Sequence, residues 1–319
     1  MGHDQRFKKF LHAFLPEFLK LFYPHVEKRL ELGEFEFLDT EVFTELHDGS
    51  RREADVVAKL RSRDGEPELV LIHIEVQARK EPVVPERMFE YYSLLRLRYR
   101  LPIFPIAVYL SRGKEGFATE VYREKLFGTD ILKFQYESVR LAHLDAEEYV
   151  DKGGPVGAAL AALMNRSARS PSRSLESLRV SMMWKVVESA LDETSQGLLI
   201  DLIQTYFPLS EKQQERYDRL VARKENRKVQ EVELTWAEKL EQKGLEKGLE
   251  EGREKGREEG REEGLLTGKR ETLLRLFSAK FGAVSKATTA RVEAIDSVDE
   301  LDDLLERLLT ATSPEDMKL

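Results

Sequence analysis

Residues 55–77 read DVVAKLRSRDGEPELVLIHIEVQ, two apolar runs separated by the polar segment SRDGEPE. Gly and Pro in that segment favour a reversal of the chain, and the β-branched residues on either side are typical of strands. Upstream, FEFLDTEVFTEL (residues 35–46) is followed by the turn-forming HDGS. We therefore expect three consecutive strands joined by two short connections, which is an antiparallel meander.

Helices flank this predicted meander. Before it, Phe7, Phe10, Phe14 and Phe18 recur at spacings of three and four, which indicates one amphipathic helix or two short ones interrupted by Pro16. After it, residues 86–100 are helical in pattern, and PIFPIAVYL (102–110) is typical of a buried strand. A further strand is predicted within 134–144, with a neighbour around 122–127. The expected order is α-β-β-β-α-β, an α/β fold with a mixed sheet.

Four segments differ in composition along the chain. We expect an α/β domain over residues 1–150 and an all-α extension over 151–239. A repeat rich in Gly, Glu and Arg covers 240–269, and a small helical C-terminal module of two or three helices covers 270–319, its last helix ending near Thr310.

The repeat places a glycine at every fourth position from Gly244 to Gly268. Each glycine disfavours a helix by ~1 kcal/mol relative to alanine, so the segment alone should be a frayed helix or a solvated linker. Two roles stay open: a charged spacer, or a close helix–helix contact through which the chain forms a homo-oligomer. Residues 231–264 carry 7 basic and 12 acidic residues, which argues against a nucleic-acid-binding tail.

Composition excludes several classes of protein. The chain has 51 Lys and Arg against 59 Asp and Glu, a net charge of −8, so it does not coat nucleic acid by bulk charge. It has no cysteine, which excludes disulfides, thiolate zinc sites and cysteine nucleophiles and fits a reducing cytoplasm. No apolar stretch reaches the ~18 residues of a membrane span, so we expect a cytoplasmic protein without a membrane partner.

Carboxylates meet on two of the predicted strands. His73, Glu75 and Gln77 share one face of their strand, and Asp55, at the start of the preceding strand, is within reach of Glu75. Such a pair suits a hard cation such as Mg²⁺, which can activate water against a phosphodiester. Gln77 could orient that water or contact a phosphate oxygen, but it carries no positive charge. The alternative is that this polar face is only the solvated side of the sheet.

Accessory residues surround this predicted site in the sequence. His73 is read as a structural or supporting residue, and Arg87 and Tyr91, four apart on the next helix, could contact phosphate or lie on an ordinary surface. Residues 51–114 hold 13 basic and 9 acidic residues, a net charge of +4 that favours DNA as a local partner. The basic residues expected to form a phosphate-contacting rim are Arg51, Arg52, Arg79, Lys80, Arg96, Arg98 and Arg100.

The order of elements and this motif resemble the PD-(D/E)XK nuclease superfamily. More narrowly, HDQRFKKF, FLDTEVFTELHDGSRREADVVAKL, LIHIEVQ, RMFEYYSLLRLRYRLPIFPIAVYL and the glycine-glutamate repeat are similar to the Rpn-type family of recombination-promoting nucleases and transposases. The C-terminal module is similar to a small helical domain of unknown function that often follows such chains. The resemblance extends over nearly the whole chain, whereas the nuclease motif itself spans residues 55–77.

The resemblance implies a restriction-endonuclease-like core and a Mg²⁺-dependent endodeoxyribonuclease. It makes Asp55 and Glu75 metal ligands, and Gln77 stands where the superfamily usually has Lys. The acid that the superfamily carries on its first helix would be Glu17 or Asp4. Two other functions stay open: a catalytically inactive nuclease fold that binds nucleic acid or a protein partner through its helical tail, and an oligomerisation module with a nuclease-like scaffold.

Overall fold

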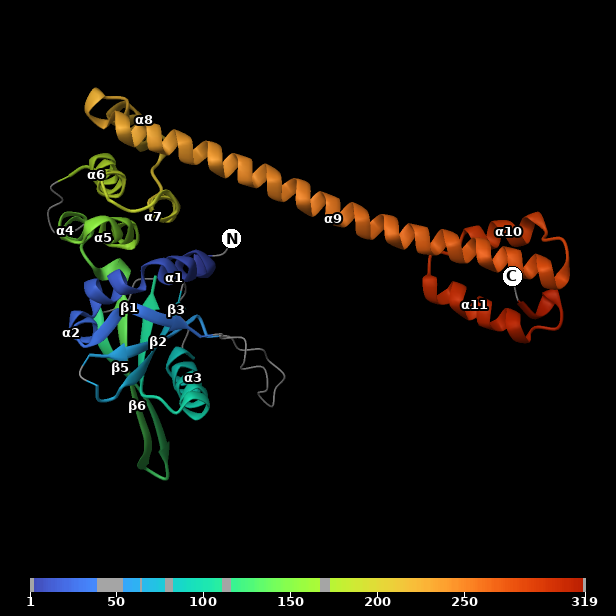
Figure 1. Cartoon of the computed structure of the whole chain (residues 1–319), viewed down its shortest axis with the longest axis horizontal. Helices are drawn as coiled ribbons and strands as arrows, with labels where there is room; N and C mark the ends of the chain where they lie inside the picture. Colours follow the sequence, from blue (N-terminus) through green and yellow to red (C-terminus); the bar gives the residue numbers. More distant parts are fainter. Residues whose placement is uncertain are drawn as a thin grey trace. The chain divides into compact units, whose positions relative to one another are not determined.

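The computed structural model describes residues 3–38, 54–63, 65–77, 83–110, 116–166 and 173–317 (Figure 1). The chain forms two compact units, Met1–Trp236 and Ala237–Leu319. The first unit contains a six-stranded sheet with helices on both faces, followed by a layer of helices. The second unit is helical throughout its described part.

The sheet has the strand order β1-β2-β3-β4-β6-β5. β1 pairs antiparallel with β2, and β2 with β3, which confirms an antiparallel meander. Its first strand, Leu30–Phe37, begins earlier than the predicted 35–46, and residues 39–46 lie outside the described residues. β4 runs parallel to both β3 and β6, and β5 pairs antiparallel with β6, so the sheet is mixed as expected. The strands are β1 (Leu30–Phe37), β2 (Val56–Ser62), β3 (Leu69–Gln77), β4 (Ile103–Tyr109), β5 (Phe117–Leu126) and β6 (Thr129–Arg140).

Alternation along the strands gives the sheet two different faces. Ile72, Ile74 and Val76 join the large core under α1 (His3–Phe22). On the opposite face, Leu71 packs with Tyr91 and other side chains of α3 (Val84–Tyr99). The predicted crossover from β3 through this helix to β4 is confirmed, and it covers the face that carries His73, Glu75 and Gln77.

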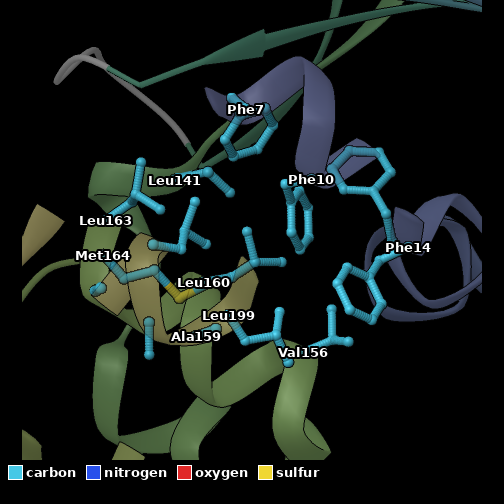
Figure 2. Close-up of a cluster of buried hydrophobic side chains, with 14 of the residues drawn as sticks. Phe7, Phe10, Phe14, Leu141, Val156, Ala159, Leu160, Leu163, Met164 and Leu199 are labelled. Carbon is cyan, nitrogen blue, oxygen red and sulfur yellow. The ribbon is translucent and has the colours of Figure 1, made fainter. Parts of the chain in front are cut away.

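The N-terminal helix is kinked, as the proline suggested. α1 contains Pro16, and Phe14 has non-helical backbone angles (φ −133°, ψ 30°). Phe7, Phe10 and Phe14 point toward side chains of the helical layer, among them Leu160 and Leu199 (Figure 2). These aromatic side chains fix α1 between the sheet and the layer, because α1 contacts β2, β3, α5 (Gly154–Leu160) and α7 (Glu193–Tyr206).

The helical layer belongs to the same compact unit as the sheet. Its side chains share one continuous hydrophobic core with α1 and the strands. The elements of this layer are η1 (Leu141–His143), α4 (Ala146–Lys152), α5 (Gly154–Leu160), η2 (Ala161–Leu163), α6 (Leu175–Val187), α7 (Glu193–Tyr206), α8 (Glu211–Val221) and η3 (Lys224–Asn226). The short helix α2 (Pro24–Glu27) instead follows α1 and contacts β1.

The glycine repeat lies inside one continuous helix, α9 (Arg227–Phe281), of 55 residues. A Cβ atom added at any glycine from Gly244 to Gly268 would meet nothing within 4 Å. The end of α9 packs with α10 (Lys286–Glu293), α11 (Val298–Thr310) and η4 (Pro314–Met317) around Leu273, Leu301 and Met317. The last predicted helix ends at Thr310, as expected, and the described part of this region is helical. Among the described helices, none has both the length and the apolar character needed to cross a bilayer.

Candidate functional site

Asp55 and Glu75 meet where β2 begins and β3 approaches its end. Val56 pairs with Ile74, so Asp55, one residue before β2, lies opposite Glu75. The Asp55 amide donates to Glu75 Oε1 at 2.9 Å, and the Val76 amide donates to Asp55 Oδ2 at 2.6 Å. The predicted juxtaposition of the two carboxylates is confirmed by these two bonds, which fix the position of both side chains.

The polar face of β3 is not solvated. His73, Glu75 and Gln77 are 0%, 3% and 4% exposed because α3 covers them, so the alternative interpretation of this face is wrong. Buried polar groups are costly unless they find partners. His73 Nε2 lies 3.0 Å from Glu75 Oε1, and the His73 ring packs edge-on against Tyr91 at 5.5 Å between centroids. His73 therefore holds the Glu75 carboxylate, and Tyr91 holds His73.

A lysine that sequence reasoning missed completes the site. Lys8, on α1, places its Nζ 2.7 Å from Asp55 Oδ1. Its neighbours Phe7 and Phe10 are buried in the core, so the helix cannot rotate without exposing them. In the sequence, Lys8 is only a charged residue beside phenylalanines that recur at helical spacing. Its contact with Asp55, 47 positions away in the printed sequence, depends on how α1 packs.

The other predicted residues are distributed around this centre. Arg87 Nε lies 4.0 Å from Glu75 Oε2, which brings this arginine to the site, one of its two predicted alternatives. Glu17 is half-buried and follows Lys8 by nine residues, beyond the kink at Phe14. Asp4 precedes Lys8 by one turn, and its side chain lies outside the described residues. The choice between the two acids stays a prediction.

Burial of two like charges perturbs the acid that faces Lys8. Desolvation, followed by repulsion from Glu75, raises the pKa of Asp55 to about 6, although Lys8 and the Val76 amide act in the opposite direction. Burial and the neighbouring carboxylate therefore disfavour the charged form of Asp55 despite its contact with Lys8. A further cation would favour the ionised form of Asp55.

Comparison with protein-family models, curated proteins and solved structures finds no match for this chain. The chemical interpretation therefore depends on the geometry of this site and on the residues of the motif.

The two carboxylates fit one class of metal ion. Within the described ranges, no group of three or more His, Cys, Asp or Glu is arranged to hold a metal. Mg²⁺ needs fewer protein ligands, because it keeps several waters and often takes only one or two carboxylates together with substrate phosphate. Asp55 and Glu75 could supply that pair. Lys8 already contacts Asp55 Oδ1, so a metal ion at that oxygen would share it or displace the ammonium.

The predicted basic rim does not close around the site within the described residues. Arg51, Arg52, Arg79 and Lys80 lie outside those residues. Arg96 and Arg98 are exposed on α3, but they follow Arg87 by nine and eleven residues, which is about 14 to 17 Å further along the helix. They lie toward the end of α3 that is remote from Glu75.

Proposed function

We propose that this chain is a Mg²⁺-dependent DNA endonuclease that hydrolyses phosphodiester bonds at Asp55 and Glu75. The observation that carries the proposal is the carboxylate pair, with Lys8 Nζ 2.7 Å from Asp55 and Arg87 4.0 Å from Glu75. Two acids and two cations in one place can bind a metal and a phosphate together. The same proposal includes a recombination-promoting, transposase-like role in DNA rearrangement for this chain, because its motif resembles that of the Rpn-type family.

The metal would supply the chemistry that no side chain here offers. Asp55 and Glu75 would hold the Mg²⁺, which would lower the pKa of a bound water and shield the negative charge that develops on the phosphate oxygens. Hydrolysis adds water across one P–O bond of the phosphodiester, leaving a phosphate monoester and a free hydroxyl.

The side chains of the chain hold the reacting groups. Lys8 can place a positive charge beside the phosphate, which the neutral amide of Gln77 cannot do. A preorganised charge at the point where negative charge develops is worth a large part of a catalytic effect. Gln77, 4% exposed and one strand repeat beyond Glu75, can orient a water through its amide. His73 keeps Glu75 in place, and Arg87 can hold a phosphate oxygen.

Cleavage of supercoiled plasmid tests the proposal. The wild-type chain should nick the plasmid with Mg²⁺ and not with EDTA, and Asp55→Ala and Glu75→Gln should remove the activity. Glu68→Gln is the matched control, because Glu68 is an exposed glutamate at the turn before β3. Unchanged cleavage in Asp55→Ala would refute the assignment.

One observation favours a second function, an inactive nuclease fold that binds nucleic acid or a protein partner. Lys8 Nζ pairs with Asp55 Oδ1 at 2.7 Å, as in a purely structural ion pair. Thermal unfolding with and without Mg²⁺ distinguishes the two functions. A ligand that binds only the folded chain raises the melting temperature. A folded chain whose melting temperature does not respond to millimolar Mg²⁺, and which cleaves nothing, would support the inactive form.

A further inference from the structure

The β5–β6 hairpin extends beyond the rest of the sheet (Figure 1). β4 pairs with β6 over Glu137–Arg140, whereas β5 pairs with β6 down to Leu126 and Thr129. β4 begins at Ile103, which in this register is level with Phe134. The five residues of β6 from Thr129 to Lys133 therefore continue past β4, for about 17 Å at ~3.3 Å per residue. The base of this arm is fixed to α3, because Phe89 stacks on Tyr122 at 5.5 Å and Tyr92 contacts Phe134 at 4.9 Å.

The tip of the arm is apolar and exposed. Phe127 is 96% exposed, and Leu126 and Ile131 are 56% and 61% exposed. Phe127 has a φ of +50° and Gly128 a φ of +81°, the signs that a two-residue type I′ turn requires. Asn or Gly suits the first of these positions better than a bulky residue, for which a positive φ is strained. A phenylalanine at the outermost position is therefore not explained by turn chemistry.

Basic residues lie on the arm and on the helix that holds its base. Arg123, Lys125 and Lys133 lie on the arm, and Arg96, Arg98 and Arg100 are exposed at the end of α3, the helix that holds the arm's base. Glu124 and Asp130 are the acids of the arm around the tip, and Asp130 pairs with Arg123 and Lys125. Six basic residues against two acidic ones favour a polyanion over a second copy of this chain, whose tip would carry the same charge.

We propose that Leu126 and Phe127 insert as an apolar wedge between stacked base pairs of duplex DNA, while these arginines and lysines contact phosphates. Apolar side chains inserted in this way unstack a base step and kink the duplex. This inference rests on the proposed function for its placement on the substrate. Ser138 of β6 is level with Ala107 and Glu75, so the tip is about nine residues, or about 30 Å, from the carboxylates along the strands. That length corresponds to about nine base pairs at 3.4 Å each.

The test measures DNA unwinding without cleavage. Closed circular DNA is relaxed by a topoisomerase in EDTA in the presence of the full chain carrying Asp55→Ala, which prevents nicking. Wedge insertion untwists the duplex and leaves a change in linking number after the protein is removed. Adding Phe127→Asn, which suits the positive φ and should preserve the turn, should abolish that change and weaken duplex binding about tenfold.

Two control variants separate the wedge from general effects. Leu309→Asn, at a 78% exposed leucine of the second unit, should leave both readouts unchanged. Lys125→Gln should reduce the slope of log K against log salt concentration by about the amount expected for one phosphate contact. It should leave the linking-number change as in the parent chain.

The outcomes separate this inference from the proposed function. If the parent chain does not bind the duplex, or if Phe127→Asn unwinds DNA as the parent does, the wedge is refuted even where the wild type cleaves. If Phe127→Asn instead abolishes self-association, or sedimentation with phosphatidylglycerol vesicles, while DNA binding persists, the tip serves another partner and the wedge is equally refuted. A chain that unwinds DNA but never cleaves it refutes the nuclease and retains the wedge.

Discussion

Replacing Lys8 by methionine removes the charge of the ammonium and keeps much of the length of the side chain. The ion pair is partly buried, with Lys8 26% and Asp55 13% exposed, so its loss should cost about 2 kcal/mol of unfolding free energy, between exposed and fully buried pairs. Lys8 lowers the pKa of Asp55, so the pKa should rise above about 6 in the variant. The destabilisation should therefore be present at pH 8 and mostly absent at pH 5, where Asp55 is already protonated.

Denaturant unfolding at the two pH values and plasmid cleavage check this prediction. Cleavage should fall about 10²-fold or more, as when one preorganised donor is removed from an active site. Adding Gln77→Lys to the Lys8→Met chain would restore a cation two residues after Glu75 on β3, and it should recover part of the activity. Lys20→Met, at an exposed lysine of the same helix, should change neither stability nor cleavage. Equal stability loss at pH 5 and pH 8, together with unchanged cleavage, would show that this reasoning is wrong.

Three further predictions concern Asp55, the glycine repeat and the tail. Between pH 4 and 6 the metal-free folded chain keeps a proton on Asp55 that the unfolded chain releases. As the pH rises from 4 to 6, the unfolding free energy of the wild type should therefore fall by up to about 3 kcal/mol relative to that of Asp55→Asn. Urea unfolding across this range measures the difference, and parallel curves would contradict it. Gly256→Ala should raise the helical circular dichroism and stabilise α9 by about 1 kcal/mol, since its added Cβ meets nothing within 4 Å. A loss of self-association in this variant would instead indicate a helix–helix contact. Sedimentation of the full chain beside a chain ending at Trp236 should show self-association only in the former; equal monomeric masses remove that role from the tail.

The carboxylate pair could be predicted because strand alternation and antiparallel pairing are local rules. His73, Glu75 and Gln77 lie on one face at a period of two, and the short connection after β2 fixes the register that places Asp55 opposite Glu75. Burial of this face could not be read from the same pattern. It depends on α3, which folds back over the strand through a crossover whose packing is not encoded in residues 69–77.

The contact of Lys8 with Asp55 and the continuity of α9 could not be predicted from local sequence patterns, and the cause differs between the two. Lys8 reaches Asp55 because Phe7 and Phe10 pack against residues more than 130 positions later in the chain. The glycines lower helix propensity, and their cost was estimated for an isolated segment. In the chain, α9 is helical at both ends, where Val229 and Leu273 are buried in the two cores, so the repeat does not need to nucleate its own helix.

The attachment of α1 to α5 and α7 makes the site discontinuous in the sequence. The two acids belong to the meander, but the helix that carries Lys8 is held by Leu160 and Leu199 and by an ion pair between Arg6 and Asp201. A random-mutagenesis screen for inactive variants should consequently yield many substitutions within residues 154–206, none of them in contact with substrate. A shortened chain of residues 1–150, made as a minimal nuclease, would keep Asp55 and Glu75. It would lose the helices that hold Lys8 in place.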